Sequence, residues 1–204
     1  MPRVKQRTPE LRDRLLQVAV ATLADGGVAG FTTRKVARGA ATSIPAVYEL
    51  FGDKAGLVRE VFFEGFRQLR HRFERLDESD DPRGDLVDVI AAFRAFVREN
   101  PVLAEVMFSR PFADFDPRPE DLAAGGSVRE FVVGRVRRCI DAGLLAGNET
   151  DIAHVLVALA QGLAAQETAG WLGTSNVSVD RRWALAFRVV LDGLAPIRHT
   201  ARTT

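Results

Sequence analysis

One short stretch of this 204-residue chain, residues 31–57, holds several side chains able to bind phosphate. Arg34 lies near its start, Tyr48 beyond its middle and Lys54 near its end. Cationic groups pair with phosphate, and a phenolic hydroxyl donates hydrogen bonds to it. Recognition of a phosphate-bearing ligand is one kind of chemistry that such side chains can perform.

Two short helices joined by a tight turn are predicted to position these side chains. Thr32 or Thr33 can cap the first helix, because a hydroxyl accepts one of the backbone N–H groups that a helix start leaves unpaired. Ser43 can cap the second, which has Pro45 in its first turn, where a missing N–H costs little. Asp53 can cap a longer third helix. Short helices with basic residues on the outside are typical of a helix-turn-helix.

The sequence lacks the residue patterns of common catalytic and metal sites. Its three histidines are scattered along the chain, and neither an HExxH nor an EF-hand pattern occurs. Neither GxxxxGKS/T nor GxGxxG, the glycine patterns that bind nucleotide phosphates, is present. We therefore expect no enzymatic activity, no cofactor and no metal, and an enzyme on an all-helical scaffold is a weaker alternative.

Twelve residues follow one recognisable pattern: Gly30, Thr32, Thr33, Arg34, Lys35, Val36, Ala37, Pro45, Tyr48, Phe51, Lys54 and Leu57. Through them residues 10–60, about a quarter of the chain, resemble the DNA-binding domain of the TetR family of bacterial repressors. One position departs from the family pattern, because Ala41 stands where the family usually has glycine in the turn. If that turn requires a positive φ, alanine is strained there.

The resemblance implies that the second short helix enters the major groove of double-stranded operator DNA. Thr33, Tyr48 and Lys54 match positions that contact phosphates, and such contacts position a protein on DNA. Arg34 matches a position that can reach a base, where guanine offers two acceptors to a guanidinium. The residues expected at the groove itself are Ile44, Pro45, Ala46 and Glu49. The first three would contact thymine methyl groups, whereas Glu49 could accept from cytosine or repel phosphate.

Positive charge is concentrated at the same end of the chain. Residues 1–60 hold 10 Lys/Arg and 6 Asp/Glu, a net charge of +4, whereas residues 61–204 hold 18 and 21, a net charge of −3. The excess coincides with the helix-turn-helix, as phosphate binding requires. Residues 1–9 form a basic arm, which is either a solvated tail or a segment that touches DNA. Because the excess is modest, binding would rely on a dimer that doubles it.

Beyond residue 54 the sequence predicts helices only, so the expected fold class is all-α. Apolar residues recur there with the helical period. The expected helices span residues 54–76, 85–100, 102–109, 120–142, 151–171 and a last segment that ends before Pro196. The resemblance implies a helix-turn-helix DNA-binding domain over 1–53, a C-terminal helical domain for effector binding and dimerisation over 54–197, and a flexible tail over 198–204.

The last two helices are predicted to form a pair. The first of them carries a stripe of small residues, Ala158, Gly162, Ala165 and Ala169, which lets another helix approach closely. The resemblance implies that both helices pair with their copies across a two-fold axis, as a four-helix bundle in a homodimer. The alternative is that both serve only the core of one protomer.

The resemblance also implies a pocket for a small-molecule effector of unknown identity in the C-terminal domain. The candidate residues are Phe66, Phe96, Met107, Phe112, Phe131, Arg135, Gln166 and Trp171. Ordinary core packing is the alternative for each apolar residue, and exposure to solvent is the alternative for the polar ones. We expect an apolar compound, aromatic or not, that is uncharged or weakly acidic.

With the resemblance, these features predict a ligand-responsive, sequence-specific transcriptional regulator, a repressor released from a palindromic operator when a small molecule binds. A ligand-independent architectural DNA-binding protein is the alternative. Cys139 stands alone among apolar neighbours, which indicates a core thiol rather than a redox sensor. No apolar run is long enough to span a bilayer, and the first residues lack a signal peptide's apolar region. We therefore expect a cytoplasmic protein with no membrane partner.

Overall fold

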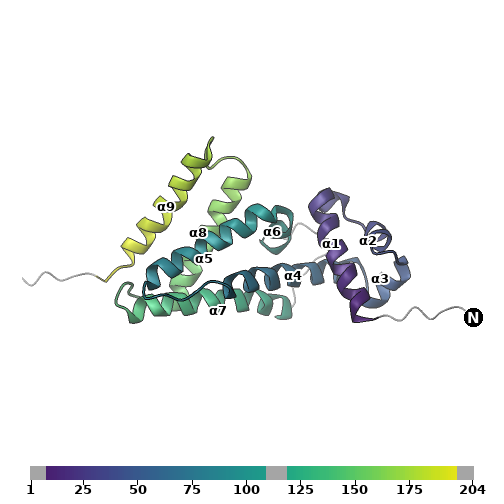
Figure 1. Cartoon of the computed structure of the whole chain (residues 1–204), viewed down its shortest axis with the longest axis horizontal. Coiled ribbons are helices and arrows are strands. Elements are labelled where there is room, and N and C mark those ends of the chain that lie inside the picture. Colours follow the sequence, from purple (N-terminus) through teal and green to yellow (C-terminus); the bar gives the residue numbers. More distant parts are fainter. Residues whose placement is uncertain (1–7, 109–118, 197–204) are drawn as a thin grey trace, which may run out of the picture. The chain divides into compact units, whose positions relative to one another are not determined.

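The computed structural model describes residues 8–108 and 119–196, and every regular element in these two ranges is an α-helix (Figure 1). The helices are α1 (Pro9–Gly30), α2 (Thr33–Gly39), α3 (Ile44–Phe51), α4 (Lys54–Glu74), α5 (Pro82–Glu99), α6 (Pro101–Phe108), α7 (Pro119–Asp141), α8 (Glu149–Thr168) and α9 (Asn176–Gly193). The expected all-α fold class is confirmed. None of the described helices is both long and apolar enough to cross a membrane.

Internal contacts divide the described chain into two compact units. The first unit holds the described residues up to Gln68 and those from Glu99 to Gly125; the second holds Leu69 to Arg98 and the described residues from Gly126 onward. Helices α4 and α7 each continue from one unit into the other. The first unit thus adds α6, most of α4 and the beginning of α7 to the three N-terminal helices. The predicted functional division at residue 54 stays a prediction.

Helix α1 forms one side of the first unit and packs against α2 and α6. Its buried leucines recur at helical spacing on one face: Leu11, Leu15, Leu16 and Leu23. A break interrupts the helix at Gly27, which has φ +62° and ψ −175° before a last turn ends at Gly30. Glycine adopts this backbone conformation without steric strain, so the chain can change direction before α2.

The caps predicted for the helix-turn-helix are confirmed. Thr32, Ser43 and Asp53 precede α2, α3 and α4, and each side-chain oxygen accepts a hydrogen bond from the backbone N–H three residues later, at 3.2, 3.4 and 2.7 Å. Each cap pairs one of the N–H groups that a helix start leaves without a partner. The start of each helix is therefore fixed by residues next to it in the sequence.

The sequence predicted strain at Ala41 if the turn between α2 and α3 requires a positive φ, and the turn has one. Ala41 has φ +52°. Thr42 N donates to Ala37 O at 2.9 Å and Ala41 N donates to Arg38 O at 3.1 Å, the two hydrogen bonds of a Schellman motif. The left-handed position of that motif is usually glycine, because a Cβ there crowds the following carbonyl. Alanine is therefore strained at this turn.

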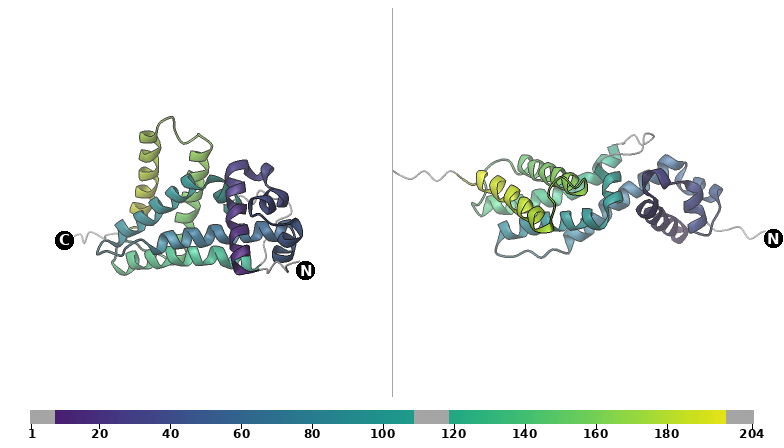
Figure 2. Two further views of the ribbon diagram at one scale, coloured as in Figure 1. Left: turned by 45° about the vertical axis from the view of Figure 1, so that its right-hand side comes forward. Right: turned by 90° about the horizontal axis from the view of Figure 1, so that it is seen from above.

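In the second unit, α5 and α7 contribute much of the core, and α5 is bonded to the α8–α9 pair. The core residues contributed by α5 and α7 include Leu86, Val89, Phe93, Phe96, Val132, Val136 and Cys139. Helices α8 and α9 lie side by side (Figures 1 and 2). Glu167 on α8 accepts a hydrogen bond from Trp183 Nε1 on α9 at 2.7 Å and two from Arg94 on α5 at 2.8 and 2.9 Å. One carboxylate thus joins three helices.

Candidate functional site

Helix α3 presents one face to the protein and the other to solvent. Val47 and Phe51 are buried in the first unit. The residues predicted to face a DNA groove are half-buried or exposed: Ile44, Pro45, Ala46 and Glu49. Tyr48 is 43% exposed, although its ring could have been buried in the core. The capped start of α3 and its outer face are therefore accessible from outside.

Two of the residues predicted to contact phosphate are brought together. Thr33 begins α2 and Tyr48 lies on α3, and their hydroxyl oxygens are 3.3 Å apart, within hydrogen-bonding distance. Either hydroxyl can donate to the other, which leaves a second proton free to point outward. Arg34, which follows Thr33, and Lys54, which begins α4, are exposed in the same unit. Hydroxyl and cationic donors on α2, α3 and α4 thus lie in the unit that presents the outer face of α3.

Two candidate effector residues are core residues of the first unit. Phe66 and Met107 are buried, and the Phe66 ring lies edge-on to Phe108 with ring centres 5.9 Å apart. A Cβ on Gly65 would lie 2.5 Å from Met107 Sδ, so this glycine lets α4 and α6 approach closely. Phe112 lies outside the described residues. Ligand-binding roles for these three candidates stay predictions.

Three other candidates lie in the second unit and differ in exposure. Phe96 is buried in the core of α5. Gln166 is exposed near the end of α8, and Trp171, just beyond that helix, is 77% exposed. The sequence indicated an apolar setting for Trp171, but in the protomer its ring is directed to solvent. Roles for these three in effector binding also stay predictions.

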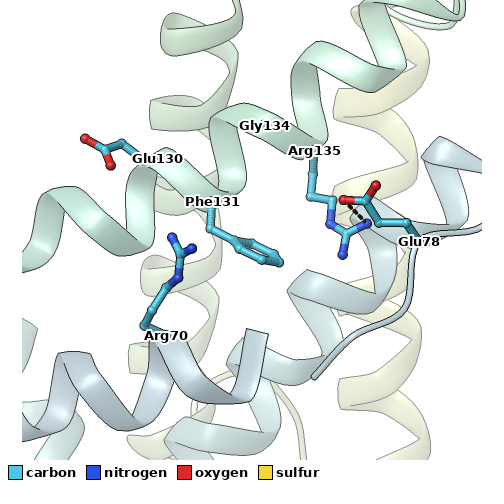
Figure 3. Close-up of a pocket in the computed structure, with 6 residues that line it drawn as sticks. All are labelled: Arg70, Glu78, Glu130, Phe131, Gly134 and Arg135. Carbon is cyan, nitrogen blue, oxygen red and sulfur yellow. Dashed lines mark ion pairs between the residues drawn. The ribbon is translucent and has the colours of Figure 1, made fainter. Parts of the chain in front are cut away.

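Phe131 and Arg135, the last two candidates, line one pocket. Its volume is about 310 Å³, and its walls are Arg70, Glu78, Glu130, Phe131, Gly134 and Arg135 (Figure 3). Arg135 Nη2 donates to Leu76 O at 3.0 Å, and its Nη1 lies 3.2 Å from Glu78 Oε1. Arg70 and Glu78 were not predicted from the sequence. A charged residue that lines a pocket and one that faces open solvent look alike in a sequence.

A buried carboxylate fastens the loop after α4 to α7. Asp85 accepts hydrogen bonds from Ser79 N, Ser79 Oγ and the Arg138 guanidinium. These bonds, that of the Ser79 hydroxyl above all, lower the pKa of Asp85 to about 2. Arg138 also donates to Ser79 O at 2.6 Å. The loop that carries Glu78 is therefore held against α7 on one side of the pocket.

The single cysteine lies in the core. Cys139 is buried, and its thiol donates to Pro82 O at 3.2 Å. Burial raises the pKa of the Cys139 thiol, so the reactive thiolate is disfavoured. This environment favours the core-thiol interpretation over a redox sensor.

An apolar face of the α8–α9 pair is exposed on the protomer. Its residues are Val155, Ala158, Gly162, Ala165, Ala169, Leu185 and Val189. The members on α8 are three or four residues apart and so share one side of the helix. The small-residue stripe is therefore exposed in the protomer, and exposed apolar residues along a helix pair are typical of an interface.

Comparison with known proteins places both units in one family. Residues 15–61 match the model of bacterial regulatory proteins of the tetR family. Residues 86–190, about half of the chain, match the model of the tetracyclin repressor-like C-terminal domain. No sequence among curated proteins matches this chain.

Several solved structures share the fold over nearly the whole chain. A protein of unknown function from Rhodococcus sp. RHA1 has a TM-score of 0.80 at 26% identity, over 95% of this chain and 100% of that one. The regulator FadR from Bacillus subtilis, solved with stearoyl-CoA, has a TM-score of 0.73 at 14% identity, over 89% of this chain and 98% of that one. A TetR variant from Acinetobacter baumannii AYE, solved with minocycline, has a TM-score of 0.63 at 18% identity, over 88% of this chain and 93% of that one. With both family models matched in chain order, this chain belongs to the TetR family of bacterial regulatory proteins.

Proposed function

We propose that this TetR-family regulator is a repressor that binds a palindromic operator as a homodimer and leaves it when a small molecule binds. The observation that carries the proposal is the exposed face of α3, where Tyr48 meets Thr33 at the surface. Val47 and Phe51 hold the helix from behind, so its outer face keeps a fixed orientation. Regulators of this family are generally not enzymes, and we propose no reaction for this chain.

Contacts to phosphate and to bases are divided among the residues around α3. Thr33, Tyr48 and Lys54 donate to phosphates on either side of the groove, and these contacts set the position of the helix. Arg34 reaches a base edge, where its guanidinium suits guanine. The groove residues predicted from the sequence contribute shape: Ile44, Pro45, Ala46 and Glu49. A sequence preference then comes from few groups, so two copies are needed for a specific site.

The homodimer forms through α8 and α9. The support for this interface is the exposed apolar face on these helices, where small residues such as Gly162 and Ala165 allow close helix packing. A two-fold interface presents the same face from both protomers. It also doubles the positive charge of the DNA-binding part, which is modest in one chain.

Release from the operator follows from a shift between two conformations. A ligand that binds the form unable to reach both half-sites more tightly than the DNA-bound form shifts the population away from DNA. Helix α4 begins at the DNA-binding part and ends in the second unit, so it is the covalent link between the two sites. The protein acts in the cytoplasm in this proposal, since its operator is genomic DNA.

The substitution Tyr48→Phe tests the proposal, because it removes one hydroxyl from each α3 and leaves the ring. If each hydroxyl contributes about 1 kcal/mol, a dimer loses about 2 kcal/mol and binds its operator roughly 30-fold more weakly. Thr174→Val is the matched control, since it removes an exposed hydroxyl from the second unit. The assay is a mobility shift with DNA selected by the unsubstituted protein. Equal affinity of Tyr48→Phe and the control contradicts the proposed docking of α3.

A further inference from the structure

The pocket between the end of α4 and the middle of α7 combines two cations with an aromatic ring. We propose that it binds a small organic carboxylate, about the size of benzoate, whose carboxylate takes the place of Glu78 beside Arg135. The inference deepens the proposed function, because it names the chemical class of the small molecule and the place where it binds. Its regulatory part rests on that function, whereas its binding part does not.

Arg135 is a buried cation whose donors the protein does not fully pair. Its side chain is 4% exposed, and Nη2 donates to Leu76 O at 3.0 Å. Among the residues that the structure describes, no group accepts a hydrogen bond from Nε or Nη1. Buried donors on a charged group are costly to leave unpaired. A ligand carboxylate gains by accepting a hydrogen bond from Nη1, the unpaired donor that faces Glu78.

Two carboxylates lie near Arg135, but neither saturates it. Asp85 Oδ2 is 3.6 Å from Nη1, and both Asp85 oxygens already accept hydrogen bonds from Ser79 or Arg138. Glu78 Oε1 is 3.2 Å from Nη1 without the geometry of a hydrogen bond, and the Glu78 side chain is 61% exposed. Ion pairs of exposed side chains are weak. A ligand carboxylate can therefore displace Glu78 into solvent and keep the charge of Arg135 balanced.

Arg70 supplies the second cation. The guanidinium carbons of Arg70 and Arg135 lie 5.0 and 5.1 Å from the centre of the Phe131 ring (Figure 3). Arg70 is oriented by its ion pair with Glu74 at 2.8 Å. Glu130 also lines the pocket, but its carboxylate points away from Phe131 and from Arg135 (Figure 3). The groups directed at the ligand thus favour an anion with an apolar body over a cation.

The size of the pocket limits the ligand to a small molecule. Its volume of about 310 Å³ is at the lower end of the range for small-molecule sites. Gly134 forms part of the wall, and a Cβ there would meet no atom within 4 Å. The absence of a side chain at this helical position keeps the space open. One ring or a short chain with one carboxylate fits this volume.

Calorimetric titration of the full chain tests the ligand class. The probes are benzoate, salicylate and hexanoate, with benzamide as a neutral analogue and inorganic phosphate as an anion without an apolar body. We expect saturable binding of at least one carboxylate, and binding of benzamide and phosphate weaker by roughly tenfold or more, since both lack one of the two recognised parts. No saturable binding of the three carboxylates overturns the inference, and so does equal binding of benzamide or phosphate.

Two substitutions at Gly134 test the place. Gly134→Leu places a side chain in the pocket from a position with open space, and Gly134→Ala is the matched control. Leucine and alanine both have a higher helix propensity than glycine, so both variants should fold. Gly134→Leu should weaken carboxylate binding by roughly tenfold or more, because its side chain occupies ligand volume. Gly134→Ala should retain it. Glu78→Gln should tighten carboxylate binding by about two- to fivefold, because the ligand no longer has to displace a carboxylate from an exposed ion pair with Arg135. Unchanged binding in Gly134→Leu overturns the inference.

DNA binding distinguishes failure of this inference from failure of the proposed function. A protein that selects an operator but binds no carboxylate refutes the inference alone. A protein that binds benzoate in this pocket but selects no DNA refutes the proposed function alone. Gly134→Leu should bind the operator like the unsubstituted protein and lose the response to the carboxylate. Carboxylate binding without any effect on operator affinity overturns the regulatory part.

Discussion

Ala41 offers the most direct test of the helix-turn-helix backbone, through the substitution Ala41→Gly. The residue has φ +52° and is exposed, so removal of its methyl group relieves strain and costs little packing. A residue with a Cβ in the left-handed region costs about 1–2 kcal/mol. Glycine in exchange loses about 0.5–1 kcal/mol more conformational entropy on folding. The balance predicts that Ala41→Gly raises the free energy of unfolding by about 0.5–1 kcal/mol.

The assay for Ala41→Gly is thermal unfolding followed by circular dichroism. A chain of this size gains about 2–4 °C in Tm per kcal/mol, so we expect a rise of roughly 1–4 °C. Protein concentration is held constant, because dissociation of a dimer makes Tm depend on it.

The matched control for Ala41→Gly removes the same methyl group from a regular helix. Ala21 is exposed on α1, where glycine is expected to lower stability by about 1 kcal/mol. The two variants therefore have opposite predicted signs. A Tm that falls in both would refute the reasoning, because Ala41 would then not hold a strained left-handed conformation.

Three further perturbations address DNA binding, assembly and acid stability. Lys54→Ala should weaken operator binding and reduce the slope of log affinity against log salt by about 2 per dimer, one phosphate contact per protomer; an unchanged slope in fluorescence anisotropy contradicts that contact. Gly162→Arg adds a charged side chain where a Cβ meets nothing within 4 Å of the protomer, so the chain should fold but elute as a monomer; light scattering that reports a dimer argues against the α8 interface. The hydrogen bond from the Ser79 hydroxyl, above all, lowers the pKa of Asp85 from its ordinary value of 3.8 to about 2, so Asp85 stabilises the fold above about pH 4 and loses that contribution as pH falls toward 2. The Tm advantage over Asp85→Asn should shrink across that window, and a constant difference rules this linkage out.

The DNA-binding part was predictable because its signals are local. Thr32, Ser43 and Asp53 cap helices through a backbone group three residues away, so the sequence alone indicated where α2, α3 and α4 start. Strain at Ala41 was expected only on the condition that the turn has a positive φ, because the family resembled usually has glycine there; the structure meets that condition. Burial of Phe51 and exposure of Tyr48 follow from their places on one helix turn.

The pocket in the second unit was predictable only in part. Phe131 and Arg135 were candidates because one is aromatic and the other is a polar residue within an otherwise apolar helix. Arg70 and Glu78 were missed, since their roles depend on how α4, its following loop and α7 pack. Exposure of Trp171 was also not predicted. The sequence around an apolar residue near a helix end does not indicate whether another element covers that residue.

The central claim is that α3 is presented outward once in each protomer and twice in the dimer. Selection of bound sequences from random DNA by the full chain, followed by footprinting, measures this most directly. We predict a palindrome whose half-sites are separated by about one helical turn of 10 base pairs or a multiple of it. A motif without two-fold symmetry, or no enrichment over the starting pool, would contradict the account.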